Sequence, residues 1–463
     1  MIVEQLYTGC LAEAAYFIVS KGEAAVIDPL RETAPYLALA IRYKAKIKYV
    51  FETHFHADFV SGHLDLAKAT GATIVYGPTA RPSFDAYIAQ DQELFTLGDV
   101  RLKVIHTPGH TLESSCFLLI DKSGKDYAVF TGDTLFLGDV GRPDLAVKSD
   151  LSQEDLAGML YDALRKRIMR LADEVLVYPG HGQGSACGKN MSAETVGTIG
   201  EQKRNNYALR PNMTREEFIE EITAGLLPPP QYFPKNALLN KVGYENIDEV
   251  MNRGLKALSV AEFSRLRDEG ALMLDTRPPD EFASGFIPGS LHIGLDGMFA
   301  VWVGTLVENL HQPILLITPE GREEETVMRL ARVGYDQTQG FLAGGLASWR
   351  IAGLPLDQIP NLKASTFAQQ YNENVSILDV RRPGEFETVH VQGATNYPLD
   401  YLLAHLDELD KKQLYYVQCA GGYRSMIAAS LLKRQGFAQI FNLSGGIQAL
   451  HNTPVPMVQA MLA

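Results

Sequence analysis

Residues able to bind a metal ion are concentrated in one short stretch near the amino terminus and recur in three later segments. The stretch contains His54, His56 and Asp58. The later segments contribute His110, Asp133 and His181. Imidazoles and carboxylates gathered this densely are costly to bury without partners, and a metal ion is the usual reason for collecting them. The ordered recurrence of such residues therefore favours a metal site over separate structural roles.

A second reactive group is a cysteine that stands between a predicted strand and a predicted helix. The apolar run 415–418 leads into Cys419, and a helical pattern covers 426–435. Unpaired N–H groups and the dipole at the start of a helix favour a thiolate there. Two glycines let the backbone curl around the sulfur, and Arg424 adds positive charge. This loop is suited to holding an anionic sulfur atom and passing it on.

Length and composition describe an ordinary globular protein. At 463 residues the chain is expected to form about three domains. Its 46% hydrophobic and 21% charged residues allow ample core. A net charge of -13 argues against a nucleic acid as partner, and no block of basic residues contradicts that.

The sequence predicts a cytoplasmic protein without a membrane segment. The first residues lack a basic region followed by an apolar core and a cleavage site. No uncharged apolar run reaches the roughly 18 residues needed to span a bilayer. The four cysteines are widely spaced and form no CxxC pair, which disfavours a disulfide framework and a structural zinc knuckle.

Short β-rich runs alternate with helical patterns in the first half of the chain. We expect strands at 16–19, 24–28, 47–51, 72–76 and 175–178, and helices at 33–43, 153–171 and 193–208. The strand at 47–51 ends just before the histidine-rich stretch, so the histidines should lie on the loop at its carboxyl end. The proline-rich passage 227–234 is interpreted as a linker or a wrapping tail.

The second half of the chain contains an internal repeat. The segment 274–282 is echoed by 378–386, and the glycine pair at 344–345 by a pair at 445–446. Each copy alternates strands with helices, which indicates two small α/β domains with parallel sheets. The predicted domains are 1–245, 250–358 and 362–463.

The ordered series of loop ligands resembles the metallo-β-lactamase superfamily. That family folds as an αββα sandwich and holds one or two metals at one edge of its two sheets. The resemblance covers roughly the first 210 residues and implies the same fold here. The overall expectation is an α/β multi-domain protein in which this sandwich is followed by the two parallel-sheet domains.

One departure from the family pattern bears on the reaction. Two-metal hydrolases of the superfamily, including glyoxalase II, carry a histidine directly after the motif aspartate, whereas this chain has Phe59. A phenyl ring has no lone pair, so the second metal loses a ligand. A site for one metal resembles the persulfide dioxygenase branch. That resemblance implies one Fe(II) per chain, held by His54, His110 and Asp133.

The remaining polar residues of the series receive supporting roles under this resemblance. Two histidines and one carboxylate leave three adjacent positions for substrate sulfur, O2 and water. His56, Asp58 and His181 are then expected to orient the ligands by hydrogen bonds. The alternative is a tetrahedral zinc ion bound by His54, His56 and His110.

Four residues near this edge are candidates for binding the thiol carrier. Arg142 has the geometry to clamp a carboxylate at two points. Cys187 lies on a flexible segment after His181 and has a thiol able to exchange with a persulfide, although buried cysteines are usually inert. The set of predicted substrate-binding residues is Arg142, Tyr178, Cys187 and Lys189.

The loop of the second repeat resembles the active loop of a rhodanese, which begins with a nucleophilic cysteine and ends with an arginine and a hydroxyl residue. Cys419 and Arg424 take the catalytic roles under this resemblance. In the first repeat Thr318 aligns with the cysteine to within a residue, and several carboxylates follow it. Without a thiol, and with groups that repel an anionic donor, this copy is expected to be an inactive rhodanese-like domain.

The predicted protein is a persulfide dioxygenase fused to a thiosulfate sulfurtransferase. Glutathione persulfide, or a similar small persulfide, would be oxidised by O2 to sulfite and free thiol, and Cys419 would exchange sulfur with sulfite and thiosulfate. The families suggest a homo-oligomer, and the charge and hydropathy of the sequence predict no nucleic-acid or membrane partner. Alternatives are a zinc thioesterase of the glyoxalase II type and a non-catalytic, sulfur-responsive scaffold.

Overall fold

The structure is a computed structural model that describes residues 1–146, 151–226 and 228–460. It divides into two compact units. The first consists of Met1–Glu249 with Leu330–Gly334, and the second of Val250–Arg329 with Tyr335–Ala463.

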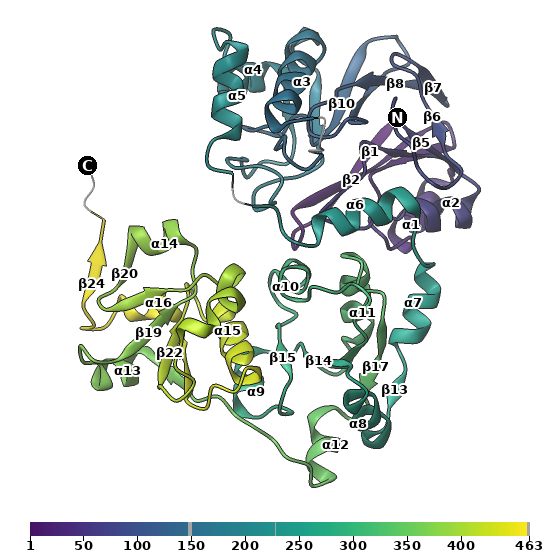
Figure 1. The fold of residues 1–463 in the computed structure, drawn as a ribbon. Helices are drawn as coiled ribbons and strands as arrows, with labels where there is room; N and C mark the ends of the chain where they lie inside the picture. The colour runs from purple at the N-terminus through teal and green to yellow at the C-terminus, as the bar shows by residue number, and fades with distance from the viewer. Residues whose placement is uncertain (147–150, 227, 461–463) are drawn as a thin grey trace. The chain divides into compact units, whose positions relative to one another are not determined.

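The first unit is built on two six-stranded sheets (Figure 1). The first sheet has the order β1-β2-β3-β4-β5-β6 and the second the order β12-β11-β10-β9-β8-β7. The strands of the first sheet are β1 (Ile2–Thr8), β2 (Glu13–Ser20), β3 (Glu23–Ile27), β4 (Lys46–Glu52), β5 (Thr73–Tyr76) and β6 (Tyr87–Ile88). Those of the second are β7 (Leu94–Leu97), β8 (Val100–His106), β9 (Ser115–Ile120), β10 (Asp126–Gly132), β11 (Leu176–Pro179) and β12 (Gly197–Thr198).

The core of this unit lies between the two sheets, and helices cover their outer faces. Aromatic rings from both sheets meet in the middle, where Phe51 and Phe117 have centroids 4.8 Å apart. Tyr36 and Leu66 pack helices onto the first sheet, and Leu160 and Phe218 pack helices onto the second. The helices involved are α1 (Ala34–Tyr43), α2 (His63–Thr70), α3 (Gln153–Lys166) and α5 (Arg215–Thr223). The predicted αββα sandwich is confirmed.

Several predicted elements differ from the observed ones at their ends. The helix expected over 193–208 is replaced by β12, α4 (Ile199–Asn205) and the 3-10 helix η2 (Tyr207–Leu209), because Thr198 caps a helix that starts only at residue 199. The 153–171 helix ends at Lys166, before η1 (Ile168–Arg170). In the proline-rich passage, Leu227 lies outside the described residues. The last two residues of the passage, Phe233 and Pro234, form the first turn of α6 (Phe233–Val242).

The loops that carry the candidate ligands all follow strands. The histidine-rich stretch follows β4, and the segments with His110, Asp133 and His181 follow β8, β10 and β11. The two sheets approach each other closely at this edge: a Cβ atom added to Gly132 would lie 2.5 Å from Thr53 Oγ1, and the backbone there has φ +48°. Glycine is therefore required at the end of β10 to bring the loops together.

The second unit contains two five-stranded parallel sheets of the same order. They are β13-β17-β16-β14-β15 and β18-β23-β22-β19-β21, and β20 pairs with β24 in a separate ribbon. The first copy has β13 (Ala257–Leu258), β14 (Leu272–Asp275), β15 (Leu291–His292), β16 (Ile314–Ile317) and β17 (Thr338–Leu342). The second has β18 (Asn361–Lys363), β19 (Ser376–Asp379), β20 (Val389–Val391), β21 (Ala394–Asn396), β22 (Tyr415–Gln418), β23 (Ile440–Ser444) and β24 (Met457–Gln459).

Helices flank both sheets of the second unit (Figure 1). The helices from the end of the first unit through the first copy are α7 (Ile247–Gly254), α8 (Val260–Asp268), α9 (Pro279–Ser284), α10 (Phe299–Leu306), α11 (Glu323–Ala331) and α12 (Gly345–Ile351). Those of the second copy are α13 (Ala364–Gln370), α14 (Pro383–Thr388), η3 (Leu399–Glu408), α15 (Tyr423–Arg434) and α16 (Gly446–Leu450).

The repeated Asp-x-Arg motif has the same structural use in both copies. Arg277 donates to Asp275 and Arg381 to Asp379, with shortest N–O distances of 2.6 Å in each case. Both pairs are buried, so these residues hold the turn after the second strand of each sheet. The sequence repeat therefore corresponds to a repeated fold.

Candidate metal centre and sulfur-transfer loop

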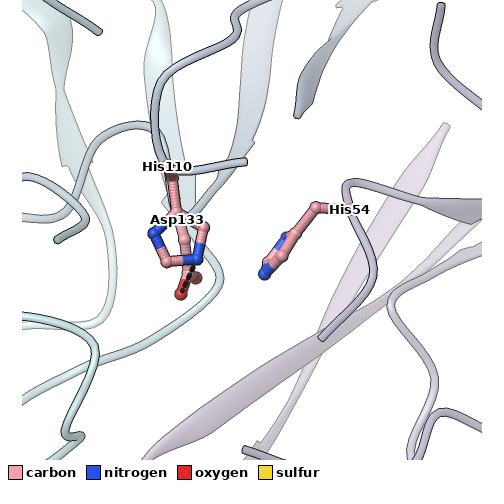
Figure 2. Close-up of side chains that lie close together, drawn as sticks. All are labelled: His54, His110 and Asp133. Carbon is pink, nitrogen blue, oxygen red and sulfur yellow. Dashed lines mark ion pairs between the residues drawn. The ribbon is translucent and has the colours of Figure 1, made fainter. Parts of the chain in front are cut away.

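Two histidines and one aspartate converge at the edge of the sandwich. His54, His110 and Asp133 are buried, and one potential ligand atom from each lies within 4.8 Å of the other two. His110 Nε2 is 3.5 Å from Asp133 Oδ2, and the ring of His54 faces this pair (Figure 2). The structure thus brings together the three residues that the sequence nominated as ligands.

The ring of His54 is oriented by a threonine and an aspartate. The Thr53 hydroxyl donates to Asp28 Oδ2 at 2.8 Å and lies 3.0 Å from His54 Nδ1. Because the hydroxyl hydrogen is given to the carboxylate, its oxygen accepts the Nδ1–H of His54. This leaves the Nε2 lone pair for a metal ion, and burial lowers the pKa of His54 well below its usual value.

His110 is oriented in the same sense by a backbone group. Its Nδ1 lies 2.9 Å from the carbonyl oxygen of Arg142. A carbonyl only accepts, so Nδ1 carries a hydrogen, and Nε2 is the nitrogen that faces Asp133. In both histidines Nε2 is therefore the atom oriented towards a metal ion.

Asp133 is ionised and hydrogen-bonded through one oxygen. Its Oδ1 is 2.8 Å from His181 Nδ1, while Oδ2 has no hydrogen-bond partner among the described residues. Burial alone would raise the pKa of this carboxyl, but the charge of His181 and its hydrogen bond outweigh burial and bring the pKa well below the usual range. A buried anionic oxygen without a hydrogen bond, 3.5 Å from His110 Nε2, fits a metal cation.

His181 bridges two carboxylates. Its Nδ1 contacts Asp133 and its Nε2 lies 2.7 Å from Asp58 Oδ2. Burial alone would lower the pKa of His181, but the two carboxylates outweigh burial and raise the pKa well above its usual value. Both nitrogens of His181 are thus engaged by carboxylates, and the role of His181 and Asp58 in orienting the ligands stays a prediction.

His56 lies beside a different pair of acids. Its Nε2 is 3.1 Å from Asp28 Oδ1 and 3.4 Å from Glu52 Oε2. The two carboxylates outweigh burial and raise the pKa of His56 well above its usual value. His56 thus lies with Asp28 and Glu52 in a group of potential ligand atoms separate from that of His54, His110 and Asp133.

Phe59 packs on the other side of His56. Their ring centroids are 4.3 Å apart, and the phenyl ring is fully buried. The position that would carry a second-metal histidine in the hydrolases is thus filled by an apolar ring packed against its neighbour.

Asp28 and Glu52 are site residues that sequence reasoning missed. They follow paired positions of the parallel strands β3 and β4, where Ile27 lies opposite Phe51. Asp28 also adopts φ 49°, a left-handed conformation that is strained for most residues. The available signal was an acidic residue directly at the end of each of two apolar strands.

The four predicted substrate-binding residues have distinct positions. Cys187 lies with Asp58 and His181 in a second group of potential ligand atoms within 4.8 Å of one another. Burial raises the pKa of its thiol well above the usual value, so Cys187 is present as a thiol. Its side chain lies at the metal centre, which Arg142 reaches through its backbone carbonyl.

The other three make structural contacts. Arg142 pairs with Asp144 through two N–O contacts of 2.6 and 2.7 Å. The Lys189 amine donates to the carbonyls of Glu221 and Ala224 at the end of α5. Tyr178 stacks on Phe130 with centroids 5.2 Å apart. Their role in binding a thiol carrier stays a prediction.

The Cys419 loop is shaped by backbone groups. The sulfur accepts a hydrogen bond from Gly422 N at 3.1 Å, and Ser425 Oγ lies 3.5 Å away. Helix α15 starts directly after Gly422, three residues earlier than predicted. A Cβ on Gly446 would lie 2.2 Å from Cys419 O, so glycine is needed where the next loop crosses.

Arg424 is held by an acidic partner. Its two terminal nitrogens donate to Glu385 at 2.7 and 2.8 Å. This bidentate pair fixes the guanidinium beside the loop, and the hydrogen bonds from Arg424 lower the pKa of Glu385. Arg424 therefore acts on the loop as one half of an ion pair rather than as an isolated cation.

The first copy has different chemistry at the equivalent place. The Thr318 hydroxyl lies 2.9 Å from Thr276 Oγ1 and 3.0 Å from Thr326 Oγ1. Arg322 pairs with Asp296 at 2.7 Å and with Glu325 at 2.9 Å. A small network of hydroxyls and ion pairs stands where the second copy has its thiol.

Within the described residues, no helix is both long and apolar enough to cross a bilayer.

Comparisons with known proteins agree with this architecture. Residues 8–181 match the metallo-beta-lactamase superfamily, and residues 259–352 and 363–453 match the rhodanese-like domain. A 2.1 Å crystal structure of a metallo-beta-lactamase from Staphylococcus aureus shares 30% identity and a TM-score of 0.67. The match covers 74% of this chain and 99% of that one.

Relatives with two different activities have similar sequence identity to this chain. Human mitochondrial persulfide dioxygenase ETHE1 is 31% identical over 211 residues, which is 45% of this chain and 74% of that protein. A probable hydroxyacylglutathione hydrolase of Schizosaccharomyces pombe is 30% identical over 181 residues, or 38% of this chain. The chain spans only 66% of that hydrolase. It belongs to the metallo-beta-lactamase superfamily and carries two rhodanese-like domains after its metallo-beta-lactamase domain.

Proposed function

We propose that the chain is a persulfide dioxygenase joined to a thiosulfate sulfurtransferase. The observation that carries the first activity is the ligand set. Two histidines and one aspartate converge, while His56 lies beside Asp28 and Glu52 and Phe59 replaces a nitrogen donor. Such a set suits a single Fe(II) with open positions for substrate and O2.

The residues around the ligands would prepare the site for this reaction. Fe(II), when bound by His54, His110 and Asp133, would supply the redox chemistry that joins O2 to sulfur. Thr53 and the Arg142 carbonyl fix the two imidazoles, and His181 fixes the carboxylate. Because the ligands are buried, few water molecules compete for the open positions.

The overall reaction balances with water as a co-reactant. A persulfide RSSH, O2 and H2O give RSH, sulfite and two protons, with the sulfur–sulfur bond broken and the outer sulfur oxidised. The carrier is proposed to be glutathione or a similar small thiol. Cys187 is a buried thiol beside Asp58 and His181, and it is proposed to contact the sulfur of the substrate.

The second activity is proposed for the last domain. The Cys419 thiolate would attack the outer sulfur of thiosulfate, forming a cysteine persulfide and releasing sulfite; the reverse reaction would consume sulfite. The N–H of Gly422 and the start of α15 would stabilise the anionic sulfur. Sulfite made at one site is a substrate at the other, and tethering raises its local concentration.

A pair of assays tests the two activities separately. Oxygen uptake with glutathione persulfide and thiosulfate sulfurtransfer are measured on the same preparation, for the unaltered chain and for Cys419→Ser. The variant should lose sulfurtransfer and keep oxygen uptake. Sulfurtransfer that survives in Cys419→Ser would contradict the assignment of the nucleophile.

The rival function is hydrolysis of S-acyl glutathione, which the similarity to hydroxyacylglutathione hydrolases favours. It requires a metal-bound water in place of O2 chemistry. A zinc-loaded protein that cleaves S-lactoylglutathione and consumes no oxygen with glutathione persulfide would establish this rival.

A further inference from the structure

Helix α15, which follows the Cys419 loop, is buried through its middle. Its residues from Ser425 to Leu432 are buried without interruption. A helix that packs on one face of a sheet buries only a stripe, so a continuous run requires a second neighbour. One side packs on β22 and β23 of its own sheet, and the other on β15 and α9 of the first copy (Figure 1).

Polar contacts join this helix to the first copy along its whole length. The Tyr423 hydroxyl donates to Gly294 O at 2.7 Å, and Ser430 Oγ accepts from His292 N at 3.0 Å. Near the other end, Arg434 donates to Gly289 O at 2.8 Å. The first copy therefore holds both ends of the helix that carries the reactive loop.

Tyr423 links the first copy directly to the sulfur environment. It is the first residue of α15 and follows Gly422, whose N–H donates to Cys419 Sγ. Its ring fits against two glycines of the first copy. A Cβ on Gly297 would lie 3.0 Å from two ring atoms of Tyr423, and one on Gly294 would lie 3.4 Å away.

The segment that receives Tyr423, residues 294–297, is braced by two arginines, Arg322 in the loop after Thr318 and Arg329 in α11. Arg329 donates to Leu295 O at 2.6 Å and to Gly297 O at 3.0 Å. Arg322, four residues after Thr318, pairs with Asp296. The cations that follow the lost cysteine position thus support a surface for the neighbouring domain.

We propose that the inactive rhodanese-like copy is a positioning module for the sulfurtransferase, and that Tyr423 is the positioning residue through which it sets the Gly422 N–H against the Cys419 sulfur. This inference rests on the proposed role of Cys419. It gives the first copy a function that needs no chemistry of its own: loss of its contact loosens the loop and weakens the stabilisation of the anionic sulfur.

The test uses the full chain with Tyr423→Phe, which removes only the hydroxyl. Tyr371→Phe is the matched control, because Tyr371 also donates to a backbone carbonyl, that of Gln392 at 3.0 Å, but lies outside the loop. The rate of Cys419 alkylation by iodoacetamide is measured from pH 5 to pH 10, together with kcat and KM for thiosulfate.

Tyr423→Phe should lower kcat roughly three- to tenfold, the effect of one hydrogen bond, and move the alkylation profile to higher pH. Tyr371→Phe should change neither quantity. Equal kcat and equal alkylation profiles for the two variants would overturn the proposal. Alkylation does not depend on sulfurtransfer, so this readout remains valid even if Cys419→Ser keeps activity and the proposed function fails.

A second pair of variants approaches the contact from the first copy. Gly297→Ala places a methyl group against the Tyr423 ring, whereas Gly321→Ala, also at a positive φ, meets open space. Gly297→Ala should shift the Cys419 alkylation profile in the same direction as Tyr423→Phe, and Gly321→Ala should not. A shift with Gly321→Ala alone would contradict the proposal.

Discussion

The metal centre and the cysteine loop prepare their reactive groups in different ways. At the metal centre, buried side chains hold one another: Thr53 connects Asp28 to His54, and His181 connects Asp58 to Asp133. At the loop, a backbone N–H meets the sulfur and glycines allow the chain to curl. The first site therefore depends on side-chain chemistry and the second on backbone geometry.

Loss of a ligand should separate the two sites most strongly. Asp133→Ala removes the buried anion that faces both histidines, so metal content and oxygen uptake should fall more than about a hundredfold. Sulfurtransfer at Cys419 should remain within about twofold, because the loop belongs to the other unit. Metal analysis and both assays on one preparation check this prediction. Parallel loss of both activities would show that the two sites are not independent.

A side-chain change next to a ligand should have the next largest effect. Thr53→Val keeps the shape of the side chain but removes the hydroxyl between Asp28 and His54, so metal affinity should fall about 10- to 100-fold. Thr70→Val, which removes an ordinary helix hydroxyl bonded to Leu66 O, is the control. Competition with a chelator measures the affinities, and equal values for the two variants would refute the role of Thr53.

A backbone change should act on the loop alone. Gly446→Ala places a methyl group 2.2 Å from Cys419 O, so sulfurtransfer should fall about tenfold and the domain should lose about 1–3 kcal/mol of stability. Gly436→Ala, also at a positive φ but in open space, separates backbone strain from the clash. Thermal unfolding and sulfurtransfer are measured for both variants. A smaller effect at Gly446 than at Gly436 would contradict this account of the loop.

The smallest effect is expected where a thiol is added to the inactive copy. Thr318→Cys in a Cys419→Ser background should give under about 1% of the original sulfurtransfer, because a thiol alone lacks an activating environment. Arg322 is already paired with Asp296 and Glu325. The same sulfurtransfer assay checks this, and substantial activity would show that the environment matters less than the sulfur.

Sequence reasoning identified the residues whose chemistry is conspicuous. Clustered histidines and a cysteine before a helix can be recognised because residue type and strand-end position restrict their use. Asp28 and Glu52 were missed because they lie far apart along the chain, and only the parallel pairing of β3 and β4 brings them together at His56. Contacts such as Tyr423 with Gly294 depend on packing between the repeats, which no local pattern encodes.

The roles of long side chains were also hard to predict. Arg142 and Lys189 have the charge expected of residues that bind a carrier, yet Arg142 pairs with Asp144 and Lys189 donates to the carbonyls at the end of α5. A flexible cation has many possible partners near a loop, and sequence alone does not choose among them.

The central claim is that this site holds one redox-active metal ion. Protein purified without oxygen and analysed by mass spectrometry for metals should contain one iron per chain, and should consume one O2 for each glutathione persulfide. Two metal ions per chain, or full zinc occupancy without oxygen uptake, would contradict the account.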